Sequence, residues 1–381
     1  MKRILHIISP GSGNFGGIES FLCGYYEYMD KKEVLFDFSF CGSNTMKMKM
    51  KDPIFHNSTF KEYRALLPSN NTFTNWITLI KLIKEQVKRN TYDIVEVHSA
   101  SPLIQAVCGF ALKQTQIPMR IAHSHAMAGP INSWKQSIAN AISTLIIQNS
   151  YDYYFSCSYA AASLYGDKVL KSNRFVKVNN AIDADEFAFN ASIRTEIRKN
   201  YNIDKDTRII GHVARLAPEK NQCFLIDVFN EYHKIDPHSI LWIVGEGQCR
   251  EEIENRIKRY NLHNSVTLFG ERKDVSELLQ AMDAFVVTSY LEGLCISAIE
   301  SQAAGLPTLT STGIPEECEI TGLIHRIDLE KGSEFWGKKL SDIVSNNIRT
   351  SMKDAIKKAG YDLQYAAKSL QGFYMQTKEI R

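Results

Sequence analysis

Several sequence features that mark special classes of protein are absent from this chain of 381 residues. No stretch approaches the ~18 consecutive apolar residues that a membrane-spanning helix needs. The eight cysteines are scattered singly, without a Cys-x-x-Cys pair, which excludes zinc-ribbon and thioredoxin-type motifs. With 44% hydrophobic and 23% charged residues, the composition is that of a globular protein of two, or at most three, domains.

The net charge is also small, at +3, so charge alone gives no reason to expect a nucleic-acid partner. This average conceals two different halves. Residues 1–182 hold 20 Lys and Arg against 12 Asp and Glu, whereas residues 183–381 hold 25 against 30. We therefore expect two bodies with different partners, and the basic first half suits an anionic surface such as that of a membrane.

The first residues begin like a signal peptide, with Lys2 and Arg3 before an apolar run. That run is too short and contains His6, so we expect a first β-strand instead. Free thiols in a reducing cytoplasm then suit the cysteines better than a disulfide framework. The expected location is cytoplasmic, with peripheral contact at the inner face of the cell membrane left open.

Short apolar runs alternate with stretches of helical periodicity, which predicts βαβ units around parallel sheets. In the first half, we expect strands at Arg3–Ser9, Leu35–Cys41, Ile94–His98, Ile117–Ala122, Tyr153–Ser158 and Phe175–Val178, and helices at Ile18–Met29, Trp76–Lys88 and Trp134–Ser150. In the second half, we expect strands at Thr207–Val213, Ser239–Val244, Val266–Phe269, Ala284–Thr288 and Thr308–Thr310, and helices at Asn221–His233, Cys249–Tyr260, Val275–Met282 and Ser297–Ala304. The pattern restarts near residue 183, so we predict two doubly wound α/β domains, 1–182 and 183–362, followed by an amphipathic helix at Leu363–Thr377.

The first βα turn is rich in glycine. Gly11, Gly13 and Gly16 match the G-x-G-x-x-G pattern of dinucleotide-binding proteins, but the expected acidic residue is not at the end of the next strand. We favour a loop that contacts a phosphate or sugar, with a plain flexible turn and an NAD site as alternatives.

Two cations follow the first strand of the second half. Arg215 and Lys220 flank Pro218, which fits the first turn of the next helix. Cations beside a helix N-terminus, at the carboxyl end of a parallel strand, are suited to binding a diphosphate. The alternative is a solvated pair on the surface.

Two carboxylates lie further along, in the segment that leads into the helix at Ser297. Glu292 is expected at the loop tip and Glu300 one turn inside the helix, while the amides of Gly293 to Ile296 can face an anion or hydroxyl groups. Both carboxylates can accept hydrogen bonds from vicinal hydroxyls. An acid/base pair for glycoside hydrolysis is the rival interpretation.

Three histidines, His98, His123 and His125, occur at the carboxyl ends of two first-half strands, where they can donate to a sugar hydroxyl or transfer a proton. Structural histidines and a zinc site are the alternatives. Asp183 and Asp185 form an Asp-x-Asp motif like that of metal–nucleotide sites, but their place in a connecting loop favours simple solvation.

Taken together, these residues resemble glycosyltransferase family 4 over nearly the whole chain. The motifs that carry the resemblance are Gly16-Gly17-Ile18-Glu19, Arg215 to Lys220, Val244-Gly245-Glu246-Gly247, Phe269-Gly270 and Glu292-x7-Glu300. Arg120 to His125 and Gly17 to Phe21 are similar to the exopolysaccharide and capsule branch. The resemblance implies a GT-B fold, a retaining mechanism, no metal or other cofactor, and a last helix (363–381) that crosses back to the first domain.

The resemblance also implies residue roles. Arg215 and Lys220 would hold the donor diphosphate, Glu300 the ribose hydroxyls and Glu292 the donor sugar. The remaining donor contacts would come from Gly16, Gly17, Gly245, Glu271, Arg272, Gly293, Leu294, Cys295 and Ile296. The active-site histidine would be His125, with His123 as the alternative, and His98 and Glu19 would contact the acceptor. The chain departs from the family at Cys295, where proline is common, and at Ala181, where glycine is usual.

We therefore expect a retaining glycosyltransferase that moves a sugar from a nucleotide donor, UDP-linked for preference, to a glycan or lipid-linked acceptor in bacterial surface polysaccharide synthesis. The second domain would bind the donor and the first the acceptor, with the anionic membrane as a further partner. A UDP-sugar 2-epimerase of similar fold and a non-catalytic nucleotide-sugar binding protein are the alternatives.

Overall fold

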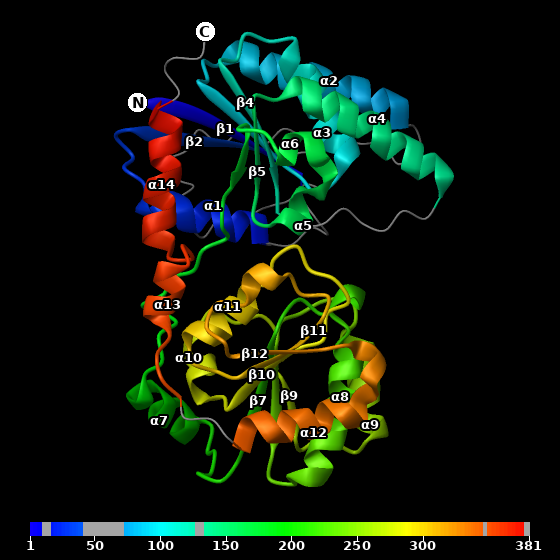
Figure 1. The fold of residues 1–381 in the computed structure, drawn as a ribbon, viewed down its shortest axis with the longest axis vertical. Coiled ribbons are helices and arrows are strands. Elements are labelled where there is room, and N and C mark those ends of the chain that lie inside the picture. The colour runs from blue at the N-terminus through cyan, green and yellow to red at the C-terminus, as the bar shows by residue number, and fades with distance from the viewer. Residues whose placement is uncertain (10–16, 41–71, 126–132, 346–348, 377–381) are drawn as a thin grey trace. The chain divides into compact units, whose positions relative to one another are not determined.

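A computed structural model describes residues 1–9, 17–40, 72–125, 133–345 and 349–376 (Figure 1). The chain divides into two compact units. Unit 1 comprises residues 1–180 together with 363–381, and unit 2 comprises 181–362.

Unit 1 is built on a parallel sheet with the order β2-β1-β3-β4-β5-β6. The strands are β1 (Lys2–Ile8), β2 (Val34–Phe40), β3 (Ile94–His98), β4 (Met119–Ser124), β5 (Tyr153–Ser156) and β6 (Phe175–Lys177). The helices are α1 (Gly17–Tyr28), α2 (Thr72–Arg89), α3 (Pro102–Lys113), α4 (Trp134–Ser150), α5 (Tyr159–Ala162), α6 (Asp167–Leu170) and α14 (Leu363–Gln376). Helices α2, α3 and α4 pack in sequence, while α1 packs against α14. The apolar side chains of α2 to α4 and of the strands beneath them form one core cluster.

Local sequence explains where the helices begin. Ser101 caps α3 by accepting from the amide of Ile104, and Pro102 fills the first helical position, where no amide hydrogen is needed. Ser133 caps α4 by accepting from the amide of Gln136 (3.2 Å). The expected bounds of β3 and α4 match the structure, whereas α3 was not anticipated.

Unit 2 contains a second parallel sheet, with the order β12-β11-β10-β7-β8-β9. Its strands are β7 (Ile209–Val213), β8 (Ile240–Val244), β9 (Val266–Leu268), β10 (Ala284–Val287), β11 (Thr308–Ser311) and β12 (Ile324–Ile327). Its helices are α7 (Ala191–Asn200), α8 (Gln222–Ile235), α9 (Arg250–Arg259), α10 (Val275–Ala281), α11 (Ile296–Ala303), α12 (Gly332–Ser345) and α13 (Lys353–Lys358). The strand β12 and the helices α7, α12 and α13 were not anticipated.

One local expectation is wrong. Pro218 does not open α8 but begins a separate 3-10 turn, Pro218–Lys220. Asn221 follows with a left-handed backbone (φ 54°), and α8 starts only at Gln222. The turn places Lys220 outside the long helix, on the loop that follows β7. In the described part of the chain, no helix combines the length and apolar character needed to cross a membrane.

Candidate functional site

The predicted site residues of unit 2 gather where its strand order reverses. The chain runs from β7 outward to β8 and β9, then returns to place β10 on the other side of β7. Ligands of doubly wound sheets bind in the crevice at the carboxyl ends of such strands. Lys220 lies in the loop after β7, and Glu292 in the loop after β10.

Lys220 and Glu292 form an ion pair at this point. The Lys220 Nζ lies 2.5 Å from the Glu292 Oε1, and both side chains are largely buried. The Ser289 hydroxyl donates to the same carboxylate oxygen (2.7 Å). A buried pair of this kind gives little net stability, but loss of one partner leaves an uncompensated charge. The pair therefore fixes the position of the Lys220 ammonium between the loops that follow β7 and β10.

Hydrogen bonds to backbone carbonyl groups fix the two loops in place. Thr288 Oγ1 donates to the carbonyl oxygens of Lys220 (3.1 Å) and Asn221 (3.0 Å). The amide of Glu292 donates to the carbonyl of Gly313 (3.1 Å), which follows β11. A Cβ on Gly313 would lie 2.1 Å from the Tyr290 carbonyl oxygen, so only glycine permits this approach. The site is held by rigid sheet ends, which preorganises the lysine.

The neighbouring loops after β8 and β9 are joined in the same way. Gly245 donates its amide to the carbonyl of Gly270 (2.8 Å). Gly245 has a φ of 135°, and a Cβ there would lie 1.9 Å from the Ala214 carbonyl oxygen. Gly245 is thus a structural requirement of the turn beside Arg215, whether or not its amide also contacts a ligand.

Glu300 lies on α11 as expected and is partly exposed. Burial, with a smaller contribution from the Glu186 carboxylate, raises the pKa of Glu300 to about 7. Glu186 itself accepts from the Ser276 hydroxyl (2.8 Å). A carboxyl group whose ionised form is disfavoured by its surroundings is typical of a functional position.

Other expected donor residues are less closely gathered. Arg215 is half exposed and pairs with Glu219 (2.6 Å), one turn along the same loop. Arg272 pairs with Asp274 (2.5 Å), and Glu271 is exposed beside it. The segment Gly293 to Cys295 is buried, and burial raises the pKa of the Cys295 thiol to about 12, which disfavours the thiolate. A pocket of about 780 Å³ between β12 and α12 contains none of the predicted site residues.

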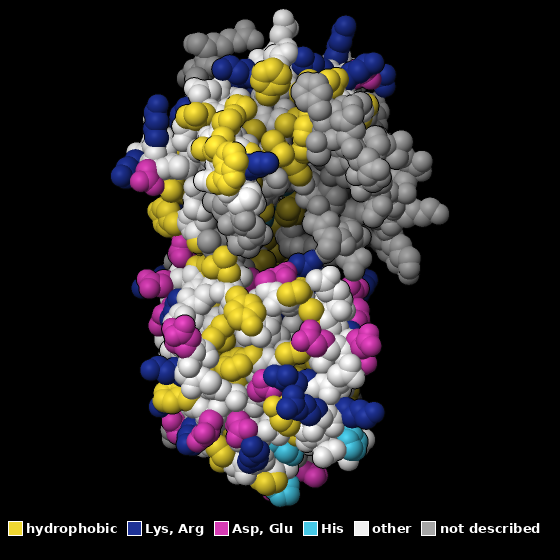
Figure 2. Space-filling view, turned by 90° about the vertical axis from the view of Figure 1, so that its right-hand side faces the viewer, with side chains coloured by type: hydrophobic (Ala, Val, Ile, Leu, Met, Phe, Trp, Pro, Cys, Tyr) yellow, Lys and Arg dark blue, Asp and Glu magenta, His cyan; other side chains and the backbone are white. Residues whose placement is uncertain are grey.

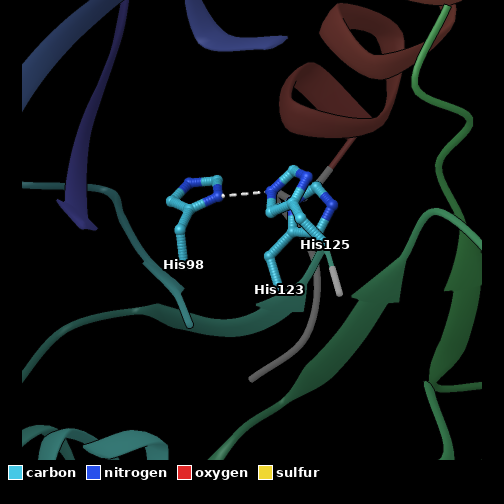
Figure 3. A group of neighbouring side chains, drawn as sticks. All are labelled: His98, His123 and His125. Carbon is cyan, nitrogen blue, oxygen red and sulfur yellow. Dashed lines mark hydrogen bonds between the residues drawn. The ribbon is translucent and has the colours of Figure 1, made fainter. Parts of the chain in front are cut away.

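Unit 1 brings its three predicted histidines together (Figure 3). The ring of His98, at the end of β3, is hydrogen-bonded to His125, with 2.9 Å between the His98 Nδ1 and the His125 Nε2. His123, on β4, stacks on His125 with ring centroids 3.9 Å apart. His98 and His123 have no exposed surface, whereas His125 is partly exposed. The ring of His98, expected to contact the acceptor, is thus enclosed by protein.

Four residues that the sequence analysis did not single out complete the cluster. His6 on β1 joins His98 (Nδ1 to Nε2, 2.9 Å), and Asn180 Oδ1 lies 3.3 Å from His125 Nδ1. The carboxylate of Glu96 contacts His123 Nδ1 (2.6 Å) and accepts from the Tyr374 hydroxyl (2.6 Å) on α14. If each ring donates from Nδ1, every one of these imidazole contacts has one donor and one acceptor.

Burial keeps these imidazoles neutral. It lowers the pKa of His6 to about 4 and that of His123 to about 3, and it holds the pKa values of His98 and His125 well below the usual range. Burial likewise raises the pKa of Glu96. The cluster is thus a hydrogen-bonded network of neutral rings, able to hold His125 in one orientation.

The same ring nitrogens are the atoms that a metal would need. One nitrogen from each of His98, His123 and His125 lies within 4.8 Å of the others. However, the rings of His123 and His125 are stacked at 24°, so their lone pairs lie in two nearly parallel planes. Tetrahedral ligands must instead converge on one ion. The arrangement fits the hydrogen-bonded network better than a zinc site.

The remaining predicted residues lie in the glycine-rich segment after β1 and in the loop that contains Asp183 and Asp185. Gly17 begins α1 and is exposed, whereas Gly11, Gly13 and Gly16 lie outside the described residues, as does the side chain of Glu19. Asp183 Oδ1 accepts from the amides of Asp185 and Glu186 (both 3.0 Å), which makes a turn. Asp185 is exposed and pairs with Lys353 and Lys357 of unit 2. These contacts agree with a solvated connecting loop.

Comparison with known proteins identifies relatives. Residues 193–357 match the family model described as glycosyl transferases group 1. The chain is 27% identical over 381 residues to the putative glycosyltransferase EpsF of Bacillus subtilis, covering 98% of this chain and 96% of that one. It is 25% identical over 245 residues to an Escherichia coli enzyme named UDP-Gal:alpha-D-GlcNAc-diphosphoundecaprenol alpha-1,3-galactosyltransferase, covering 62% and 60% of the two chains.

The fold also has solved relatives. The crystal structure of Anabaena HepE in complex with UDP superimposes with a TM-score of 0.70 at 16% identity, over 99% of this chain and 97% of that one. This likeness confirms the expected GT-B fold class, with two Rossmann-like units and a last helix, α14, that belongs to unit 1.

Proposed function

We propose that this chain is a retaining glycosyltransferase of family 4 that moves a sugar from a UDP-sugar to a glycan or lipid-linked acceptor. The supporting observation is the ion pair of Lys220 and Glu292 at the crevice of unit 2. The names of relatives support a role in bacterial surface polysaccharide synthesis, since one is called an O-antigen biosynthesis glycosyltransferase. The relative named for a UDP donor and a lipid-linked acceptor supports the proposed substrates.

In this proposal, Lys220 stabilises the leaving diphosphate. Negative charge develops on the leaving oxygen as the glycosidic bond to the donor breaks, and a preorganised cation lowers the energy of that state. Arg215 also binds the diphosphate, after its ion pair with Glu219 breaks. Breaking this pair costs little free energy because exposed ion pairs are weak. These cations supply the charge that a divalent metal supplies elsewhere, so we propose that the reaction needs no metal or other cofactor.

The carboxylates hold the two ends of the donor. Glu292 already accepts from Lys220 and Ser289 on one oxygen, Oε1. Its other oxygen, Oε2, is the proposed acceptor for a donor-sugar hydroxyl. Glu300 accepts the ribose hydroxyls, and these hydrogen bonds favour its ionised form. The amides around Glu271 and Arg272 contact the base, Gly245 lines the donor site, and the amides of Gly293 to Ile296 contact the sugar or phosphate.

In unit 1, we propose His125 rather than His123 as the active-site histidine, because His125 is partly exposed whereas His123 is fully buried. Both of its ring nitrogens have partners within the unit. The contact with Asn180 is the longer, at 3.3 Å, so it is the one that a substrate hydroxyl would displace. His98 then acts as a positioning residue that fixes the opposite edge of the ring. Gly16, Gly17 and Glu19 remain proposed ligand contacts of unit 1.

A screen of nucleotide sugars by thermal shift tests donor binding, because a ligand that binds only the folded state raises the melting temperature. We expect UDP and a UDP-sugar to stabilise the protein in EDTA, and Glu300→Gln to weaken the response. A donor that binds but is interconverted without any acceptor would indicate the epimerase. Donor binding without turnover in the presence of any acceptor would indicate a non-catalytic binding protein. A strict need for metal would overturn the metal-free reaction.

A further inference from the structure

Helix α4 carries an apolar stripe that faces solvent. Trp134, Ile138, Ile142 and Leu145 are 70%, 51%, 53% and 60% exposed. Their spacing of four, four and three residues places them on one side of the helix. The buried face of α4 is small and consists of Ser143, Ile147 and Ser150. This helix therefore presents its larger apolar side chains outward, the reverse of an ordinary surface helix.

The apolar surface continues onto the next helix. Leu103 and Phe110 of α3 are 41% and 50% exposed and lie two turns apart on one side of the helix. Helices α3 and α4 pack closely along their length. A cluster of exposed apolar side chains across neighbouring helices marks a binding surface, whereas singly scattered ones do not.

The charge of these helices has one sign. No acidic residue occurs in α3 or α4, which carry Lys113 and Lys135. The Lys135 ammonium lies 5.7 Å from the Trp134 ring centre. Helix α2 beside them carries Lys81, Lys84, Lys88 and Arg89 against a single acid, Glu85, and the Lys84 Nζ donates to Gln114 at the end of α3 (2.5 Å). In Figure 2, hydrophobic side chains gather on this face of unit 1, with basic side chains among and above them.

We propose that the outer faces of α3 and α4, which we call the α3–α4 face, dock onto an anionic lipid bilayer. The apolar side chains enter the boundary between lipid headgroups and acyl chains, and the lysines contact lipid phosphates. A tryptophan beside a lysine is suited to the headgroup level, where one end of a side chain is apolar and the other wet. A second copy is a poorer occupant, because a two-fold contact would set this basic face against itself.

The position of the face gives this docking a role. Parallel helices of a doubly wound unit begin at the carboxyl edge of the sheet, and α4 begins nine residues after His125. The apolar end of α4 therefore lies at the same edge as the proposed acceptor site. This role rests on the proposed function, since a lipid-linked acceptor would be presented from the bilayer to that edge.

Vesicle co-sedimentation of the full chain, without donor or acceptor, tests the docking. We expect binding to phosphatidylglycerol-containing vesicles and little to phosphatidylcholine alone. The double substitution Ile138→Ser with Leu145→Ser should reduce partitioning by about tenfold or more. The matched control is Ile235→Ser with Tyr365→Ser, which removes equally exposed apolar side chains elsewhere. The control should bind as the unmodified protein does.

Trp134 supplies a second readout that does not depend on sedimentation. Its fluorescence should shift to shorter wavelength with anionic vesicles, and the shift should vanish in Trp134→Phe. Equal vesicle binding by the two double variants would overturn the proposal. So would a concentration-dependent dimer in light scattering that only the Ile138 and Leu145 substitutions dissociate, since that result assigns the face to self-association. Donor-induced thermal shifts are independent of this face, so failure of docking and failure of the proposed transferase are distinguishable.

Discussion

Replacing Glu300 with glutamine should stabilise the protein while weakening its donor site. Burial and the Glu186 carboxylate raise the pKa of Glu300 from 4.5 to about 7. The folded protein therefore holds the proton more tightly than the unfolded chain does. Stability is highest when the group is protonated, falls as pH rises from about 4.5 to about 7, and stays reduced above that range.

The size of the effect follows from the pKa. A rise from 4.5 to about 7 corresponds to about 3 kcal/mol, an upper value because the side chain is partly exposed. An amide resembles the protonated acid, so Glu300→Gln should raise the free energy of unfolding by up to about 3 kcal/mol near pH 8. Near pH 5 the gain should be much smaller. Glu186→Gln should raise the free energy of unfolding by a smaller amount, because it removes the carboxylate that makes the smaller contribution to the pKa of Glu300.

Urea unfolding at the two pH values measures these differences. Glu196→Gln, an exposed carboxyl on α7, is the control and should change stability little at either pH. In parallel, titration with UDP near pH 8 should show that Glu300→Gln weakens binding by about tenfold, the loss expected for hydrogen bonds to a charged acceptor. A stability change that is the same at both pH values would refute the electrostatic origin, and unchanged UDP affinity would refute the ribose contact.

Three further predictions concern turnover. Lys220→Ala should lower kcat by roughly 10²-fold or more through loss of transition-state charge stabilisation, while Lys199→Ala on α7 should not; equal rates in assays of UDP release would remove Lys220 from the mechanism. His98→Gln should lower kcat with donor affinity unchanged and should alter the pH profile of kcat; a fall in UDP affinity instead would indicate a structural role. Activity should survive EDTA. If EDTA instead abolishes activity, Mn²⁺ restores it and Asp185→Asn prevents that recovery, the loop containing Asp185 would be a metal site.

Much of the fold could be predicted because the chain alternates two clear periodicities. The bounds expected for β3 and α4 match the structure, and those of most other elements differ by a few residues. Helix α3 was missed because it is apolar nearly all round, with buried residues on several sides, so its periodicity is weak. The edge strand β12 was missed because Ile324–Ile327 is short and contains His325 and Arg326.

The candidate site was predictable as separate residues but not as contacts. Lys220 and Glu292 are 72 residues apart, and their pairing depends on β10 returning beside β7, which no local pattern specifies. The partners of the histidines are similarly distant, since Tyr374 reaches Glu96 from the far end of the chain. The burial of His98 also depends on packing from these distant elements, so the sequence alone could not predict it.

The most direct test of the proposed transferase is acceptor-dependent sugar transfer in EDTA. Purified protein would be incubated with a UDP-sugar identified by thermal shift and with a diphosphate-linked lipid acceptor, and the product analysed by mass spectrometry and NMR. We predict UDP release only when acceptor is present, a product heavier by one sugar, and the anomeric configuration of the donor retained. Release of UDP without transfer, or a product of inverted configuration, would contradict the proposed reaction.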